Sequence, residues 1–265
     1  KGEPTPDAPF TPFTKGSELR VVGKVAKGVT GTRIRYWADR QIFTKGAGFQ
    51  PEELVGRARQ TAFLVPGLGI TIRDERGEEP STESFKFDGG ISEFVEHLAS
   101  DAPVTDVWRI QGVGGYTETV PVLQENGHMV PTELTRECEV DIALRWGTGY
   151  DTVVKSFVNI IATPKGGTHQ NGFEQGLLKF LRAEVEKNAR RLKAGNDKLE
   201  KDDVLAGLTA VLTVRLPEPQ FEGQTKEVLG TPAVRAIVAN AIAKGLKERF
   251  ASTKRDDKAQ TALVL

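Results

Sequence analysis

Apolar and polar residues alternate regularly along residues 208–216. One side of this segment carries leucine, alanine and valine, whereas the other side carries Thr209, Thr213 and Arg215. This period of two predicts a half-buried strand. Pro217 and Pro219 then end the strand, because proline cannot donate a backbone N–H to a neighbouring strand. The pattern therefore predicts a rigid strand that leads into a loop at residues 221–226.

The same alternation predicts two more strands earlier in the second half of the chain. Residues 138–146 alternate with one polar face, and residues 152–161 follow after a turn at Gly147-Thr148-Gly149. A glycine turn between two strand patterns predicts a β-hairpin. We therefore expect these two strands to pair directly with each other.

Helical spacing of apolar residues frames the strand at 208–216 on both sides. Residues 173–192 form one such pattern, and residues 234–250 form another after Thr231 and Pro232. Thr231 as N-cap and Pro232 in the first turn favour a helix start. With a short helical turn at 202–206, the order is β-β-α-β-α. This order predicts one sheet with its helices on one face.

The first half of the chain has shorter and weaker patterns, and residues 1–15 are predicted to be a loop. Residues 99–103 are the best candidate for a domain boundary. The predicted strands lie at 18–26, 32–37, 69–73, 83–87 and, less clearly, within 106–130, and the predicted helices lie at 51–64 and 92–98.

Three glycines cluster at residues 112–115, which invites comparison with a phosphate-binding loop. Such a loop must open a helix, but the residues that follow are typical of a strand. We therefore interpret the cluster as a turn or bulge. Nothing in the sequence matches the spacing of a P-loop.

Composition narrows the classes of function. The 265 residues include 36 basic and 36 acidic side chains, so bulk charge does not call for a nucleic-acid partner. No apolar run reaches the length of a membrane span. Cys138 is the single cysteine and the three histidines are scattered, so neither a disulfide framework nor a zinc site is predicted. A reducing cytoplasm fits this composition. The first residues look neither like an initiator nor like a signal peptide, so we expect a piece of a longer protein.

Two local features suggest anion binding, each with an ordinary alternative. Lys226 and Gln224 lie in the loop after the 208–216 strand, where an ammonium and an amide suit phosphate recognition. The alternative is a solvated turn. Residues 179–193 hold six basic and two acidic side chains, which suits either a solvated helix face or contact with DNA phosphates.

Three motifs occur in order along the chain: Gly31-Thr32-Arg33-Ile34-Arg35-Tyr36-Trp37-Ala38-Asp39, Gly166-Gly167-Thr168-His169 with Gly172-Phe173, and Glu218-Pro219-Gln220-Phe221-Glu222-Gly223-Gln224-Thr225-Lys226. They resemble the B subunit of bacterial type IIA topoisomerases, the gyrase B and topoisomerase IV ParE family. Two further segments, residues 38–43 and 62–68, look more similar to actinobacterial topoisomerase IV-like subunits than to gyrase B.

The resemblance implies an α+β fold in two parts. Residues 1–98 would be the C-terminal part of a GHKL ATPase domain. Residues 99–265 would be a transducer domain with a ribosomal-protein-S5-like fold and a left-handed β-α-β crossover. It also implies ATP as cofactor, with Mg²⁺ held by an N-terminal segment absent here and, in the full subunit, by a TOPRIM domain.

Site residues carry over from the resemblance one at a time. Lys226 matches the family lysine that reaches the ATP γ-phosphate, and Gln224 matches the glutamine at the same phosphate; these are the expected catalytic residues. Thr32, together with those two, is an expected nucleotide-binding residue, because it matches the threonine that helps to hold adenine. One departure is Glu174, where many relatives have an arginine that faces DNA.

The implied function is the coupling of ATP binding and hydrolysis to DNA strand passage, that is, supercoiling, relaxation or decatenation. The implied partners are DNA, an A-type subunit in an A2B2 heterotetramer and a second B subunit. The isolated fragment is expected to be an inactive monomer in the cytoplasm. Two alternatives stay open: the transducer of a chaperone or mismatch-repair ATP clamp, and a stand-alone S5-like nucleic-acid-binding module.

Overall fold

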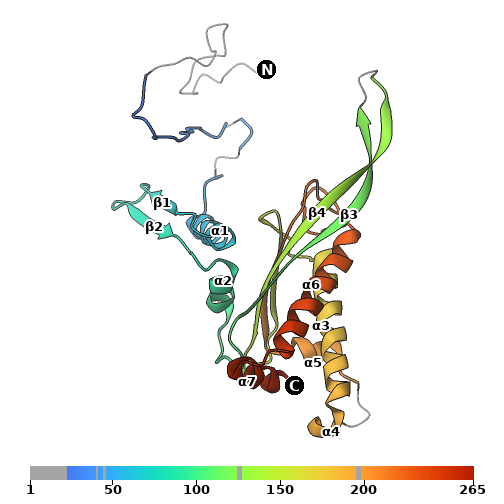
Figure 1. Cartoon of the computed structure of the whole chain (residues 1–265). Helices are drawn as coiled ribbons and strands as arrows, with labels where there is room; N and C mark the ends of the chain where they lie inside the picture. Colours follow the sequence, from blue (N-terminus) through green and yellow to red (C-terminus); the bar gives the residue numbers. More distant parts are fainter. Residues whose placement is uncertain (1–22, 40, 44–45, 124–126, 195–197) are drawn as a thin grey trace. The chain divides into compact units, whose positions relative to one another are not determined.

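The structure is a computed structural model that describes residues 23–39, 41–43, 46–123, 127–194 and 198–265 (Figure 1). The chain divides into two units, Lys1–Leu54 and Val55–Leu265. No helix among the described residues is long and apolar enough to cross a membrane.

A five-stranded sheet in the order β3-β4-β7-β5-β6 organises the second unit. Neighbouring strands are antiparallel except β7 and β5, which are parallel and joined by a helical crossover. The segment that forms this sheet also contains helices, so the expected α+β class is confirmed. The strands are β3 (Trp108–Leu123), β4 (Met129–Trp146), β5 (Val153–Val158), β6 (Ile161–Ala162) and β7 (Leu208–Arg215), and the crossover contains α3 (Thr168–Lys187), α4 (Ala189–Leu192) and α5 (Lys201–Leu205).

The predicted hairpin between residues 138–146 and 152–161 is wrong. β7 lies between β4 and β5 and pairs with both of them. β7 is buried on both faces at most positions, and a central place in the sheet is the one that gives such a strand two neighbours. The 152–161 segment is also two strands, because Asn159 and Ile160 adopt positive φ and turn the chain back between β5 and β6.

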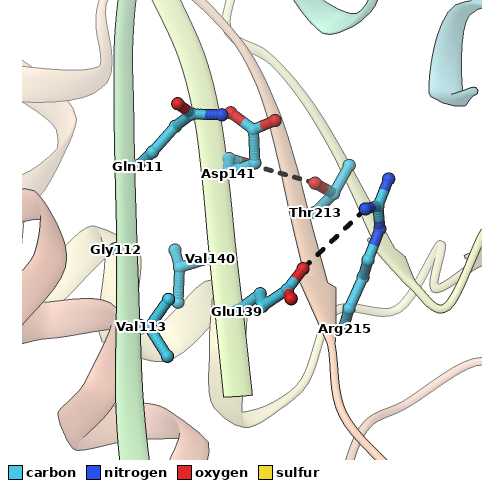
Figure 2. A pocket seen from close by; sticks show the side chains of 8 residues that line it. All are labelled: Gln111, Gly112, Val113, Glu139, Val140, Asp141, Thr213 and Arg215. Atoms are coloured by element: carbon cyan, nitrogen blue, oxygen red, sulfur yellow. Dashed lines mark hydrogen bonds and ion pairs between the residues drawn. The ribbon is translucent and has the colours of Figure 1, made fainter. Parts of the chain in front are cut away.

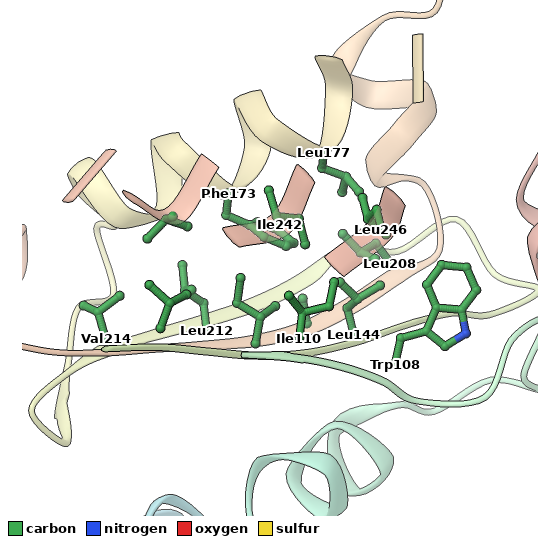
Figure 3. Close-up of a cluster of buried hydrophobic side chains, with 14 of the residues drawn as sticks. Trp108, Ile110, Leu144, Phe173, Leu177, Leu208, Leu212, Val214, Ile242 and Leu246 are labelled. Atoms are coloured by element: carbon green, nitrogen blue, oxygen red, sulfur yellow. The ribbon is translucent and has the colours of Figure 1, made fainter. Parts of the chain in front are cut away.

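The helices α3 and α6 (Ala233–Phe250) pack side by side on one face of this sheet, and Figure 3 shows the apolar side chains between them and the strands. Phe173 and Leu177 from α3 and Ile242 from α6 are fully buried there. A Cβ at Gly172 would meet the carbonyl oxygen of Arg235, so the absence of a side chain lets α3 approach α6 closely. This layer provides the main core of the unit.

The opposite face of the sheet is also covered, so helices do not lie on one face alone. Phe63 from α1 (Pro51–Leu64) and Phe94 from α2 (Ile91–Leu98) pack with Val211 and Phe157 of the sheet. The short antiparallel pair β1 (Ile70–Asp74) and β2 (Ser81–Phe85) connects the two helices. Because α1 and α2 cover Val211, β7 is buried on both faces rather than half-buried.

The glycine cluster at 112–115 forms neither a turn nor a bulge. Its residues continue the β3–β4 ladder without interruption. A Cβ at Gly114 would lie 2.6 Å from the Cγ2 of Ile237 in α6, and a Cβ at Gly112 would lie 2.9 Å from the Cβ of Ala241. The glycines therefore let α6 lie directly on β3. This role in packing agrees with our interpretation that the glycine cluster is not a phosphate-binding loop.

Two predicted strands at the start of the chain are not present where the structure describes it. Residues 23–39 contain no strand and are exposed throughout. Without a neighbouring strand among the described residues, their alternating pattern has no ladder to join. The remaining part of the predicted strand at 18–26 and the predicted loop at 1–15 lie outside the described residues.

Most of the other predicted elements are confirmed within a few residues, with two differences in the helices. The predicted helix at 173–192 breaks at Asn188 into α3 and α4. A last helix, α7 (Arg255–Val264), was not predicted. It is tied to the sheet by Gln260, whose Oε1 accepts a hydrogen bond of 2.7 Å from the indole Nε1 of Trp108.

Candidate functional site

The strand β7 delivers the chain to the 217–228 loop from a fixed point. Leu216, just after the strand, is clamped by the side chain of Asn159. Asn159 Nδ2 donates to the Leu216 carbonyl at 2.7 Å, and Asn159 Oδ1 accepts from the Leu216 N–H at 3.0 Å. The strand itself is buried along most of its length. The loop therefore starts from a rigid base, as the sequence predicts.

Backbone hydrogen bonds join the two arms of the loop to each other. Glu222 N–H donates to the Val228 carbonyl at 2.9 Å, and Gly230 N–H donates to the Gln220 carbonyl at 2.8 Å. The hydroxyl of Thr231 accepts from the Gln220 N–H at 3.0 Å. Thr231 is therefore a loop anchor and not the predicted N-cap, since α6 has no side-chain cap and is preceded by Pro232.

The second arm is held by the Gly166-Gly167 segment that precedes α3. Leu229 is fully buried, its N–H donates to the Gly166 carbonyl at 3.1 Å, and its carbonyl accepts from the Thr168 N–H at 2.9 Å. Gly167 has φ of 135°, and a Cβ there would collide with the Leu229 backbone. The paired glycines thus form the seat of the loop. The sequence shows the glycine motif, but this role in holding the loop was not predicted.

Polar side chains from the β3–β4 hairpin brace the base of the loop. Arg136 Nη2 contacts Glu218 Oε2 at 2.7 Å, and Gln220 Nε2 donates to Glu118 Oε1 at 2.6 Å. Glu218 adopts a positive φ of 50°, which a non-glycine residue keeps only where its surroundings hold it. The base of the loop is consequently fixed from two sides.

At the tip, the two predicted catalytic residues lie close together and are exposed. Lys226 has its Nζ 5.8 Å from the centre of the Phe221 ring and forms no ion pair with a carboxylate of the described residues. Among the described residues, the Gln224 side chain has no hydrogen-bond partner. An ammonium without a counter-ion, beside a free amide, is a suitable donor set for a phosphate group. The residues present at this tip therefore fit a phosphate group.

Glu227 is the acidic neighbour of this tip, and its charge is compensated. Lys165 Nζ lies 2.7 Å from Glu227 Oε2, and the Thr225 hydroxyl donates to the same oxygen at 3.1 Å. These two hydrogen bonds, with Lys165 first, lower the pKa of Glu227 below its usual value. The carboxylate is therefore ionised at neutral pH and faces Lys165.

Thr32, the third predicted nucleotide-binding residue, belongs to the other unit of the chain. It is exposed and lies in a segment without regular structure. The structure thus brings Lys226 and Gln224 together on one loop, whereas the role of Thr32 stays a prediction.

His169 of the glycine motif is a buried structural residue. Its Nε2 lies 3.0 Å from the Thr163 hydroxyl, which in turn lies 2.8 Å from the Ser156 hydroxyl. Desolvation lowers the pKa of His169 to about 4, so the ring is neutral at pH 7. Across the described residues, no group of three acidic, histidine or cysteine side chains could hold a metal ion.

A hollow of about 380 Å³ lies over β3, β4 and β7, away from the loop residues described above (Figure 2). Its charged side chains are already paired: Arg215 lies 3.8 Å from Glu139, and Arg109 lies 2.8 Å from Asp141. The Thr213 hydroxyl donates to the Asp141 carbonyl at 3.1 Å. This hollow therefore offers no unpaired charge to a phosphate, in contrast to the loop tip.

The basic stretch at 179–193 is only partly available for DNA. Arg182 donates to the Leu199 carbonyl at 2.6 Å, and Lys187 pairs with Glu184. Glu174, at the position where the resemblance implies an arginine, lies 2.5 Å from Lys201. This carboxylate thus has a local partner, and a DNA contact at this position is not supported by its charge.

The chain matches known proteins of one family. The family model described as DNA gyrase B matches residues 90–263. The chain is 37% identical over 232 residues to the DNA gyrase B protein of Treponema denticola and 38% identical over 250 residues to that of Campylobacter jejuni. These alignments cover 86% and 93% of this chain but 33% and 29% of the relatives. The chain thus spans about a third of the length of these relatives.

Solved structures show the same likeness. The 43K ATPase domain of Thermus thermophilus gyrase B, in complex with an aminocoumarin, has a TM-score of 0.67 and 27% identity, with 92% of this chain and 60% of that chain covered. The topoisomerase IV ATP-binding domain of Francisella tularensis has a TM-score of 0.64 at 24% identity and shares the fold; 93% of this chain and 61% of that chain are covered. The resemblance to the gyrase B and topoisomerase IV family is confirmed.

Proposed function

The chain belongs to the DNA gyrase B family, and on that premise we propose that it senses the γ-phosphate of ATP as part of a type II DNA topoisomerase. We propose that residues 1–98 are the C-terminal part of the ATPase domain and that residues 99–265 are the transducer. Lys226 and Gln224 bind the terminal phosphate of ATP, and Thr32 helps to hold the adenine. Mg²⁺ would be held by an N-terminal segment and by a TOPRIM domain of the complete subunit, as the resemblance implies.

One observation carries this proposal. The ammonium of Lys226 has no carboxylate partner among the described residues, although the loop that bears it is anchored by buried Leu229 and by several backbone hydrogen bonds. A surface lysine that binds no ligand does not need such a scaffold. A charge that must meet a phosphate at a defined point does, because binding and catalysis depend on preorganised geometry.

The chemistry follows from the charge of the transferred group. Phosphoryl transfer places negative charge on the γ-phosphate oxygens, and an ammonium at that place offsets it. The amide of Gln224 adds a directional hydrogen bond that is weaker because it is neutral. Once the phosphate is released, both groups lose their ligand, so the loop has different contacts before and after hydrolysis.

The sheet connects the loop to the rest of the transducer, so a change in the loop's contacts can affect the whole domain. The loop follows β7, the central strand, which pairs with β4 and β5 and packs under α3 and α6. A change at the loop would therefore shift the populations of two positions of the transducer as a body. In the complete protein this shift would drive DNA strand passage together with an A-type subunit and a second copy of the B-type chain.

The test is Lys226→Gln in the complete protein. ATP turnover should fall by about 10²–10³-fold, the usual loss when one donor to transition-state charge is removed. Gln224→Ala should reduce turnover less. Lys247→Gln, which changes an exposed lysine of α6, is the matched control and should leave turnover unchanged. Wild-type turnover in a folded Lys226→Gln protein would refute the proposal.

A further inference from the structure

The tip of the loop has a second charged contact that the function above does not use. Lys165, in the segment before α3, meets Glu227, the residue directly after Lys226. Besides the side-chain contact of 2.7 Å, the Lys165 N–H donates to the Glu227 carbonyl at 3.3 Å. The Thr225 hydroxyl binds the same carboxylate oxygen at 3.1 Å. Glu227 is thus held by its side chain and by its backbone.

This contact separates two opposite charges that are neighbours in sequence. The Glu227 carboxylate faces Lys165, whereas the Lys226 ammonium lies over the ring of Phe221. Without Lys165, the carboxylate would be the nearest available counter-ion in sequence for Lys226. It would also repel the negative oxygens of a nucleotide at the loop tip. Both effects would make Lys226 a poorer ligand for phosphate.

Folding stability does not explain the contact. The Lys165 side chain is 67% exposed and that of Glu227 is 33% exposed. Ion pairs this accessible to water contribute little to the free energy of unfolding. The effect of the contact is therefore expected on the loop, where it fixes the residue next to Lys226.

We propose that Lys165 and Glu227 form a latch: Lys165 holds the Glu227 carboxylate away from Lys226 and neutralises it, so that the Lys226 ammonium stays available for the γ-phosphate. This inference rests on the proposed function of Lys226. Lys165 is a positioning residue: it acts through Glu227 and does not itself touch ATP.

The experiment is a double-mutant cycle of ATP hydrolysis in the complete protein. Lys165→Met should lower kcat/KM by about three- to tenfold, the effect of one uncompensated charge near a charged ligand at a protein surface. In Lys165→Met/Glu227→Gln the carboxylate is gone as well, so kcat/KM should return to within about twofold of wild type. Lys165→Arg keeps the ion pair and should keep the activity.

Controls separate the latch from general effects of charge and from the function of Lys226. Lys86→Met removes another exposed lysine that lies 3.7 Å from a carboxylate, that of Asp88, and should have no effect on kcat/KM. In a Lys226→Gln background, Lys165→Met should lower kcat/KM less than it does in the wild type, because only the repulsion between the Glu227 carboxylate and the nucleotide remains. If the double variant stays as low as Lys165→Met, Lys165 acts by its own charge and the latch is refuted. If Lys226→Gln itself is fully active, the proposed function fails first.

Discussion

The two segments that carry the predicted nucleotide-binding residues differ in how firmly the chain holds them. Lys226 and Gln224 lie on a loop that follows a buried central strand and closes on a buried leucine. Thr32 lies within residues 23–39, which are exposed and contain no strand. The difference shows that one segment has its own scaffold within this chain. The other segment has none among the described residues.

This contrast separates two kinds of site residue. A charge that reports on a phosphate must be held by the body that it moves, and the Lys226 loop is tied directly to the five-stranded sheet. A residue that only helps to hold the base does not need this connection. We therefore expect substitutions in β7 and around the loop to affect stability and ATP use, and substitutions in 23–39 to leave stability almost unchanged.

The largest expected effect is on stability. Leu212→Ala in β7 should lower the free energy of unfolding by about 2–5 kcal/mol, because Leu212 is fully buried and its removal leaves a cavity. Ile34→Ala is the matched control, since Ile34 is 81% exposed, and should change it by less than about 0.5 kcal/mol. Denaturant unfolding measures both. Equal losses would show that residues 23–39 have a packed scaffold after all.

A second effect should appear in the pH dependence of stability. The pKa of His169 is about 4 in the folded chain against 6.5 in the unfolded chain. The unfolded state therefore binds more protons between these values, so stability is full above pH 6.5 and falls as the pH drops towards 4. The total loss is on the order of 3 kcal/mol.

The matched variant for this prediction is His169→Gln, which keeps a polar side chain but cannot titrate. Its free energy of unfolding, measured by denaturant at several pH values, should lack the decrease assigned to His169. The same decrease in both proteins would mean that other groups cause it and that His169 is not a buried neutral residue.

Much of the second half of the fold could be predicted from the sequence, because its apolar periods are long and regular. The strand at 208–216 and the helix at 234–250 are examples. Strand order could not be predicted, since alternation shows which faces are buried but not which strands are neighbours. The hairpin of β4 with β5 was wrong for this reason. Val211 lies on the side of β7 that otherwise carries polar residues, and it is buried under α1 and α2.

The sequence suggested residues for the candidate site, whose role stays a prediction, but it did not show what supports them. Lys226 and Gln224 came from a family resemblance, and the loop geometry agrees with such a role. Gly167 and Leu229 hold the loop, yet their contact joins segments far apart in sequence, and no local pattern shows it. Lys165 and Glu227 likewise look like ordinary surface charges until the fold places them 2.7 Å apart.

The most direct measurement is amide hydrogen exchange in the complete protein with ADP and with a non-hydrolysable ATP analogue. The account predicts that residues 221–229 gain protection with the ATP analogue and not with ADP, since only the former has a γ-phosphate. Residues 29–37 should respond equally to both nucleotides if Thr32 helps to hold the adenine. Equal protection of 221–229 by both nucleotides, or none by either, would contradict the central claim that the Lys226 loop senses the γ-phosphate.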